Sequence, residues 1–243
     1  MPNLRDIKKL ISPLSATPLH PQWLFSESGS HIIDNIKAIH GKKTVIDIGC
    51  ATQWPKKHLA TECHYIGIDF PETANHWYKT KPDIYSDASE LGIANNGADV
   101  ALLLDVLEHL SDPDKALEEI HRILKKKGIL ILEVPFLYPL HDEPRDFQRY
   151  SKYGLEQLAD KHGFLIKECH SSGHPVVTSA LMGNLAISKT FINWLDDKSP
   201  MLVFGLLLPF YFLFNNLCAK LIASLSKKDD FMPYSYQLVF EKI

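Results

Sequence analysis

The sequence of 243 residues lacks several features that would place it in a familiar class at once. Its four cysteines lie far apart without a CxxC pair, which excludes a disulfide framework and a cysteine zinc site. None of its twelve histidines stands in an HExxH or similar spacing, so no metal site is expected. The net charge of −3 provides no basic field, so nucleic acid is not expected as a partner.

A secretory leader is also not expected. The N-terminal stretch MPNLRDIKKLISPLS carries charges and prolines where a signal peptide needs an apolar core, so the cytoplasm is the expected compartment. No internal repeat or low-complexity tract is visible. Hydrophobic residues make up 45% of the chain and charged residues 23%, which is typical of one globular domain, here with room for an appendage.

From residue 43 onward, short apolar runs alternate with helical patterns. The runs cover 44–49, 65–70, 98–105, 128–135 and 164–169. Apolar residues at helical spacing predict helices over 112–128 and 151–163, with Asp112 and Ser151 as N-caps and Gly128 and Gly163 at their ends. Solid apolar strands between helices predict an α/β fold, a doubly wound and mostly parallel sheet covered on both faces.

Acidic residues stand at the ends of the predicted strands, where such sheets bind ligands. Asp47 precedes Gly49, Asp69 ends the next run, and Asp105 ends the run over 98–105. Asp69 is placed as the acidic residues that accept hydrogen bonds from ribose hydroxyls usually are, about 20 residues beyond a glycine turn. The alternative is that Asp47 and Asp69 only cap turns.

The turn GCATQW (49–54) disfavours a nicotinamide cofactor. It has one glycine where a pyrophosphate needs a glycine-rich turn, and Asp47 before it would repel a phosphate. A ligand with a positively charged amino group and a sulfonium would instead be attracted to Asp47.

Residues 43–170 resemble the class I S-adenosylmethionine-dependent methyltransferases of the type 11 kind. The resemblance rests on VIDIGC, YIGIDF, YSDASEL and, most specifically, DVLEHLSDP followed by ALEEIHRILKKKG. It implies a Rossmann-like sheet of seven strands whose last strand is YSYQLVFEK, after an apolar helical insertion. The implied division is a helical cap (1–42), a core (43–175), the insertion (176–230) and the final strand (231–243). The stretch PFLYPLHDEPRDFQRYSKYGLEQL resembles a subgroup associated with bacterial surface-glycan and lipid-linked sugar pathways.

The resemblance also implies which positions bind S-adenosylmethionine. One departure is Ala51, where the family usually has a second glycine, because alanine tolerates fewer backbone angles. The expected contacts are Asp47, Gly49, Cys50 and Ala51 around the methionine end, Asp69 at the ribose, Asp87 and Ala88 at the adenine, and Asp105 and Val106 at the pocket floor.

The polar loop PLHDEPRDFQRY (139–150) has two interpretations that can both hold. It is either a salt-bridged loop that orders the next helix or the part of the site that meets the methyl acceptor. In the second case the proton acceptor is His141 or Asp142, and Arg145 or Arg149 grips a phosphate or carboxylate. The remaining expected acceptor contacts are Tyr138 and Tyr150.

The pair Glu108 and His109 lies one helical turn beyond Asp105. We expect His109 to be a packing histidine hydrogen-bonded to backbone, and Glu108 to be structural.

Residues 201–225 form an apolar run in which Lys220 is the sole charge, after an amphipathic helical pattern over 180–195. The run approaches the ~20 residues that cross a bilayer, but Pro209, Asn215 and Asn216 interrupt it. A single crossing would also separate the last strand from its sheet. A hairpin in one leaflet, an in-plane interfacial helix, and a cover for the core or a dimer partner are left open, and we favour the membrane interface over 180–225.

The expected function is methyl transfer from S-adenosylmethionine to a hydroxyl of a sugar or lipid-linked acceptor, by a cytoplasmic enzyme peripheral to the membrane. The alternative is a non-catalytic protein of the same fold that binds the cofactor or serves as a membrane-recruited partner.

Overall fold

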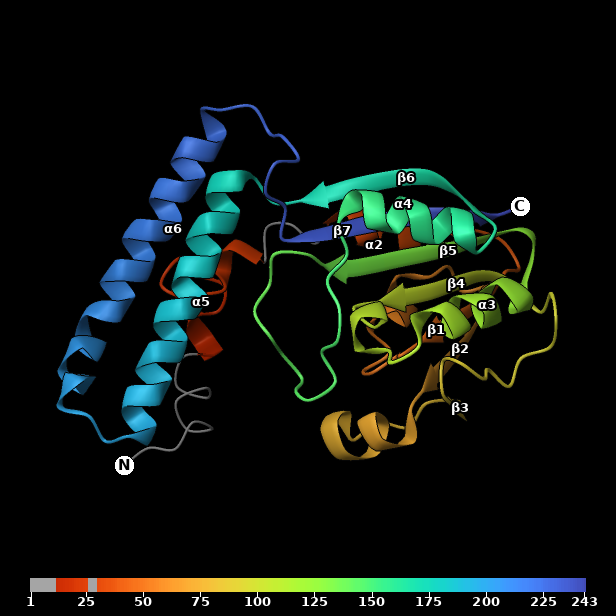
Figure 1. The fold of residues 1–243 in the computed structure, drawn as a ribbon, viewed down its shortest axis with the longest axis horizontal. Coiled ribbons are helices and arrows are strands. Elements are labelled where there is room, and N and C mark those ends of the chain that lie inside the picture. Colours follow the sequence, from red (N-terminus) through yellow and green to blue (C-terminus); the bar gives the residue numbers. More distant parts are fainter. Residues whose placement is uncertain (1–11, 26–29) are drawn as a thin grey trace. The chain divides into compact units, whose positions relative to one another are not determined.

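The computed structural model describes residues 12–25 and 30–243. Its seven strands form one sheet in the order β3-β2-β1-β4-β5-β7-β6 (Figure 1). Strands β1 to β5 pair in parallel, and β7 pairs antiparallel with β5. The mostly parallel, doubly wound sheet is thus confirmed. The strands are β1 Thr44–Ile48, β2 His64–Asp69, β3 Ile84–Tyr85, β4 Ala98–Leu104, β5 Leu124–Pro135, β6 Phe164–Ser172 and β7 Ser235–Lys242.

The helices begin where the sequence places their caps. Asp112 accepts a hydrogen bond from the Lys115 amide (3.0 Å), and Ser151 accepts one from Gly154 (3.2 Å). The α-helices are α2 Ser30–Lys37, α3 Pro113–Ile123, α4 Lys152–Lys161, α5 Pro175–Asp196 and α6 Leu208–Ser224. The shorter helical turns are η1 Ser12–Leu14, η2 Trp23–Phe25, η3 Trp54–His58, η4 Thr73–Tyr78, η5 Leu107–His109 and η6 Pro200–Leu207.

The predicted helix over 112–128 is too long. Helix α3 ends at Ile123, and Leu124 already pairs with Ala98 of β4 as the first residue of β5. The ammonium of Lys242, on β7, donates to the carbonyls of His121 (2.6 Å) and Leu124 (2.7 Å). Lys242 is far away in the sequence, yet its side chain satisfies carbonyl groups at the end of the helix. A local sequence pattern could not predict this contact.

Apolar residues cover both faces of the sheet because neighbours along a strand point to opposite sides. On one face Ile46, Leu103 and Leu132 pack with residues of α3 and α4. On the other face, Val45 and Leu102 pack against α2. This packing fixes the positions of the carboxyl ends of the strands, where a ligand site can form.

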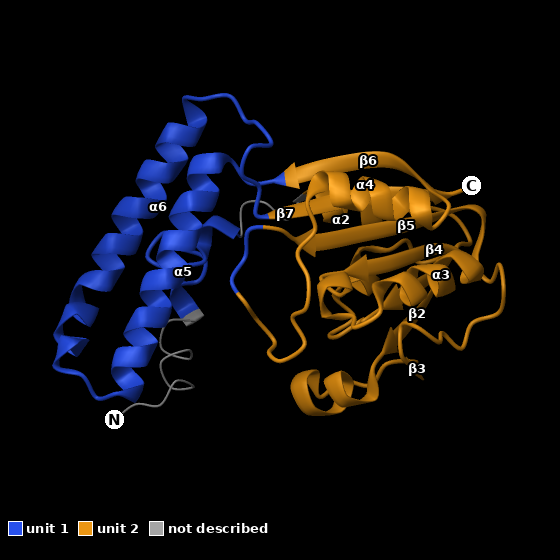
Figure 2. Ribbon diagram, in the orientation of Figure 1, with its two compact units in different colours: residues 1–29, 137–139, 172–234 blue, residues 30–136, 140–171, 235–243 orange. Residues whose placement is uncertain are grey.

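The chain divides into two compact units (Figure 2). One contains the sheet and comprises 30–136, 140–171 and 235–243; the other comprises 1–29, 137–139 and 172–234. The expected cap over 1–42 therefore falls in both units: α2 belongs to the sheet unit, and 12–25 to the helical unit. Its residues 1–11 and 26–29 lie outside the described residues.

The helical unit is built around a pair of helices, α5 and α6. Their interface contains an amide network in which Asn184 donates to Asn216 and Asn215 donates to Asn184, both at 2.8 Å. Asn216 also donates to the carbonyls of Pro18 (2.8 Å) and His20 (3.1 Å). The asparagines that interrupt the apolar run thus serve the interior of this unit.

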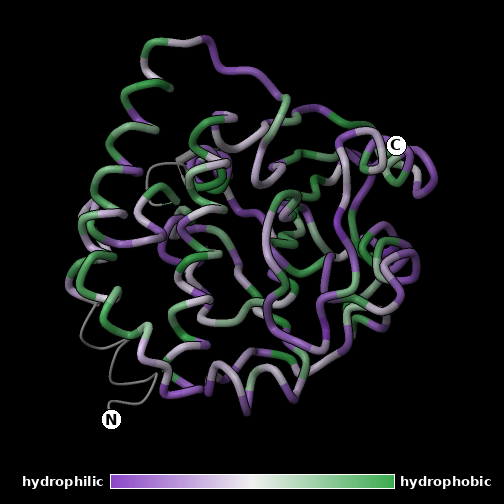
Figure 3. Tube along the Cα trace, turned by 60° about the vertical axis from the view of Figure 1, so that its left-hand side comes forward, coloured by the Kyte–Doolittle hydropathy of each residue, from purple (hydrophilic) through white to green (hydrophobic). Residues whose placement is uncertain are grey.

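The outer face of the same run is apolar and exposed. Within the described residues, η6 and α6 together form one helical stretch, Pro200–Ser224, that is long and apolar enough to cross a membrane by length and composition. Only 11% of its most apolar 18 residues are buried. Most of this run is coloured hydrophobic in Figure 3. Leu206 is 76% exposed and Phe214 72%, whereas Phe212 is buried. The other exposed apolar residues of the run are Met201, Val203, Phe204, Leu207, Phe210, Leu217, Leu221, Ile222 and Leu225.

Candidate active site

A cavity of about 370 Å³ lies in the sheet unit at the carboxyl ends of β1, β2 and β4. This volume is in the range of small-molecule sites. The expected residues that line it are Gly49, Asp69, Asp87, Ala88, Asp105, Val106, Asp142 and Arg145. The expected residues that do not line it are Asp47, Cys50, Ala51, Tyr138, His141, Arg149 and Tyr150.

Asp47 is buried on β1 and holds the hydroxyl of Tyr65, which donates to its Oδ2 at 2.5 Å. Burial raises the pKa of Asp47 to about 7, and the nearby charge of Asp69 adds to the rise while the Tyr65 bond opposes it. The same surroundings raise the pKa of Cys50 to about 12, so its thiol is inert at neutral pH.

Asp69 ties the end of β2 to the turn after β1. Its Oδ2 accepts the Ala51 amide at 2.8 Å, and its Oδ1 accepts the Phe70 amide at 2.8 Å and the Thr73 hydroxyl at 3.0 Å. A carboxylate has about four acceptor positions, so one position is left for a ribose hydroxyl. A second hydroxyl can bind by displacing Thr73, whose hydroxyl also donates to the Phe70 carbonyl.

The turn itself has an unusual backbone. Gly49 has φ +72°, and a Cβ there would lie 2.4 Å from Cγ2 of Val106, so only glycine fits. Ala51 has φ 42°, in the left-handed region that glycine adopts most readily. The structure thus keeps the glycine conformation at Ala51 at a cost of roughly 1–2 kcal/mol.

On the far wall, Asp87 and Ala88 follow the short strand β3. Asp87 accepts the Ser89 amide through Oδ1 at 2.8 Å, which fixes the turn. Both residues line the cavity, as expected for an adenine subsite.

Asp105 forms the cavity floor with a left-handed backbone, φ 53°. Asp105 is exposed and lines the cavity just after the end of β4. Desolvation and the charges of Glu133 and Glu108 raise its pKa well above the ordinary value, while His141 lowers it. These surroundings therefore favour the protonated form of Asp105.

Four aromatic side chains also line the cavity, and sequence reasoning did not identify them. Trp77 and Tyr78 come from η4 after β2, where no apolar periodicity marks them as part of a site. The other two are Phe70 and Phe147.

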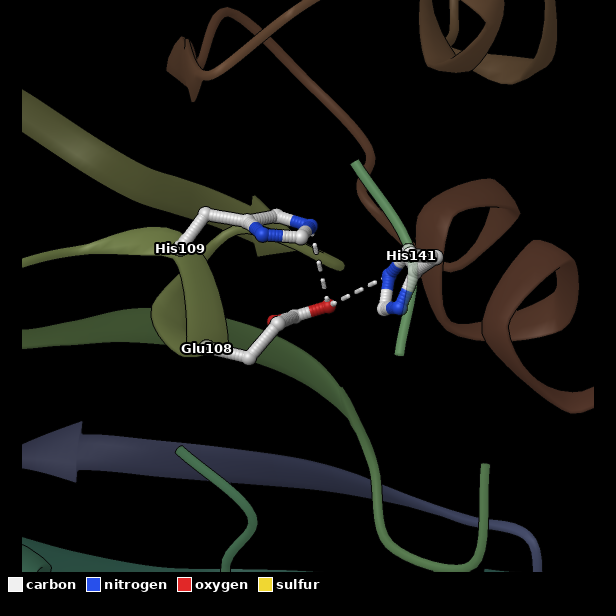
Figure 4. A group of neighbouring side chains, drawn as sticks. All are labelled: Glu108, His109 and His141. Atoms are coloured by element: carbon white, nitrogen blue, oxygen red, sulfur yellow. Dashed lines mark ion pairs between the residues drawn. The ribbon is translucent and has the colours of Figure 1, made fainter. Parts of the chain in front are cut away.

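The most polar cluster beside the cavity contains Glu108, His109 and His141 (Figure 4). Glu108 is 0% exposed, and its Oε1 lies 3.6 Å from Nε2 of His109 and 3.8 Å from Nε2 of His141. Neither oxygen of Glu108 has a hydrogen bond within the described part of the chain. Nδ1 of His109 lies 2.7 Å from the Arg145 carbonyl, so the predicted backbone bond of this histidine is present.

The loop over 139–150 contains the predicted internal salt bridges. Asp146 pairs with Arg149 and accepts the His141 amide at 2.9 Å, and the Arg149 hydrogen bond is the main cause that lowers the pKa of Asp146 to about 2. Arg149 is thus engaged within the loop.

The other expected acceptor residues differ in their surroundings. Arg145 pairs with Glu72 and stacks on Phe70 at the cavity, with its guanidinium carbon 5.0 Å from the ring centre. Tyr150 donates to Gln148 within the sheet unit. Tyr138 belongs to the helical unit, where its ring packs edge-on to Phe25.

Comparison with known proteins agrees with this geometry. Residues 46–132 match the family model described as a methyltransferase domain. No curated protein matches the chain. Among solved structures, the cyclase SpnF is similar with a TM-score of 0.55 and 16% identity, over 99% of this chain and 96% of that chain. A SAM-dependent methyltransferase from Archaeoglobus fulgidus is similar with a TM-score of 0.54 and 16% identity, over 88% and 92% of the two chains.

The cavity residues suit the cofactor of such a domain. Carboxylates at the ends of β2 and β4 match its hydroxyls and positive charges, and apolar Ile48, Ile68 and Leu110 line the same cavity. The sheet therefore has the Rossmann-like fold of methyltransferases, and residues 46–132 match a methyltransferase domain.

Proposed function

We propose that this protein transfers the methyl group of S-adenosylmethionine to a hydroxyl of a sugar or lipid-linked acceptor at the cytoplasmic face of a membrane. The observation that carries the proposal is the cavity in which Asp69, Asp87 and Asp105 converge from three strand ends.

The cofactor supplies a sulfonium whose methyl carbon is attacked by the acceptor, with an excellent leaving group. The chain's task is then mostly alignment, which can supply much of the rate. Asp69 and Asp87 hold the nucleoside end. Asp142 and Arg145 line the same cavity, where Asp142 accepts the proton of the acceptor and Arg145 positions the acceptor.

The membrane part of the proposal follows from how the apolar helices are connected. The chain enters α5 from β6 and returns from α6 to β7, and both strands belong to one sheet. An apolar hairpin whose two ends belong to one sheet can enter a single leaflet but cannot cross a bilayer once. Its exposed leucines and phenylalanines provide the apolar contact, and Lys220, Lys227 and Lys228 near its end can meet anionic headgroups.

A second candidate is a protein of the same fold that binds the cofactor without transferring its methyl group. Two observations favour it: Asp69 already accepts three hydrogen bonds from its own chain, and one solved protein of similar fold is named a cyclase.

Labelled S-adenosylmethionine distinguishes the two candidates. The protein is incubated with cofactor labelled in the methyl group and with separate soluble and membrane-lipid fractions of a cell extract. Label that enters the lipid fraction only with active protein supports the proposal. Cofactor binding without any transferred label supports the second candidate.

A further inference from the structure

We propose that Glu108, His109 and His141 form a binding site for one divalent transition-metal ion at the edge of the cavity. The three residues come from η5 and from the loop over 139–150, and one ligand atom of each lies within 4.8 Å of the others. Figure 4 shows the carboxylate of Glu108 pointing between the two imidazoles.

The first argument is the state of Glu108. A fully buried carboxylate without a hydrogen bond is costly unless a cation compensates its charge. The two imidazole nitrogens are 3.6 and 3.8 Å away, beyond hydrogen-bond length. A cation placed among the three groups would provide the missing partner.

The second argument is the spacing of the ligand atoms. At metal–ligand lengths of about 2.0–2.2 Å, tetrahedral ligands lie about 3.3–3.5 Å apart. The two separations from Oε1 of Glu108 exceed this by a few tenths of an ångström, and all three ligand atoms lie within 4.8 Å of one another. Rotations that bring the two imidazoles toward each other would complete the site.

The third argument concerns the outer nitrogens of the two histidines. Nδ1 of His109 donates to the Arg145 carbonyl at 2.7 Å, which directs its Nε2 lone pair toward Glu108. Nδ1 of His141 lies 3.2 Å from the Asp146 carboxylate; Arg149 approaches the same nitrogen only at 3.5 Å. Carbonyl and carboxylate partners of this kind orient histidines that bind metals.

Two imidazoles and one carboxylate favour a transition-metal ion such as Zn²⁺ over Mg²⁺, which prefers oxygen ligands. Three protein ligands leave a coordination position for a water or substrate. His109 lines the cavity, so this position is accessible to a bound acceptor.

The role of the ion rests on the proposed function. Coordination would lower the pKa of the acceptor hydroxyl. Its proton would pass to Asp142 and then to solvent. The oxygen would form a bond to the methyl carbon while the carbon–sulfur bond breaks, and the electron pair would stay on sulfur in S-adenosylhomocysteine.

Metal binding is tested without reference to activity. Chelator-treated full-length protein is dialysed against Zn²⁺, Co²⁺ or Mg²⁺, and bound metal is counted. We expect one Zn²⁺ or Co²⁺ per chain, weaker Mg²⁺ binding, and at least about 100-fold weaker Zn²⁺ binding in Glu108→Gln, His109→Gln and His141→Gln. Exposed His40 and Glu143 provide the matched controls His40→Gln and Glu143→Gln, which should bind Zn²⁺ normally.

Two outcomes would overturn the site: no bound Zn²⁺ in the unchanged protein, or equal loss in the controls. Retained S-adenosylmethionine binding shows that each variant is folded. If Zn²⁺ binds but no label is ever transferred, the site stands and the proposed function fails. If chelated protein transfers methyl groups at full rate, the role of the ion is wrong.

Discussion

At the scale of single residues, Asp69 ties the end of β2 to the turn after β1 and is the proposed acceptor for a ribose hydroxyl. Replacing Asp69 with alanine should weaken S-adenosylmethionine binding by about 1–3 kcal/mol, because a ribose hydroxyl loses its acceptor. Calorimetry measures the change. Asp69→Asn retains one acceptor oxygen and should therefore weaken S-adenosylmethionine binding less. Asp160 is exposed on α4, and Asp160→Ala is the control. Equal affinity in Asp69→Ala and the control would remove Asp69 from the site.

The raised pKa of Asp47 predicts an unusual pH dependence of the free energy of unfolding. Its folded pKa of about 7 lies above the ordinary value of 3.8, so the fold favours the protonated carboxyl. Its contribution to stability is complete below about pH 4 and is lost as the pH rises to about 7. The free energy of unfolding should therefore fall by about 1.4 kcal/mol for each pH step of one within this range.

Asp47→Asn should remove this dependence while keeping an acceptor for Tyr65. Urea unfolding of both proteins between pH 4 and 8 provides the measurement. The variant should gain stability relative to the unchanged protein as the pH rises. Parallel profiles across this range would show that burial does not perturb Asp47.

At the scale of elements, the loop over 139–150 combines an internal scaffold with a surface at the cavity. Asp142→Ala or Arg145→Ala should slow methyl transfer at least tenfold with nearly unchanged cofactor affinity, because both line the cavity where we propose that the acceptor binds. Rates and calorimetry on each variant test this, with Glu143→Gln as a control in the same loop. Full transfer rates in both variants would make the loop structural only.

The strands, the caps and the acidic strand ends could be predicted because their causes are local. Ser151 caps α4 through a residue three positions away. The predicted end of α3 was wrong because Lys242, on a strand far along the chain, donates hydrogen bonds to carbonyl groups at the end of the helix. The grouping of Glu108 and His109 with His141 was missed because a loop, not a spacing motif, brings them together.

At the scale of the whole molecule, the membrane proposal rests on the exposed apolar residues over 201–225. Replacing Leu206, Leu207, Phe210 and Phe214 with serine should abolish flotation with anionic liposomes, because these exposed side chains provide the apolar contact. Phe212, which lies in the same apolar run, is buried and should be left unchanged.

A matched control replaces Tyr153 and Leu165, which are exposed apolar residues of the sheet unit, with serine. This variant should float like the unchanged protein, and both variants should bind S-adenosylmethionine. If the unchanged protein stays at the bottom of the gradient, the membrane proposal is wrong.

Calorimetric titration of the purified protein with S-adenosylmethionine, S-adenosylhomocysteine and NAD tests the central claim most directly. The acidic strand ends and the single-glycine turn predict saturable binding of the first two, at one site per chain, and no heat from NAD. Binding of NAD with no response to S-adenosylmethionine would contradict the account.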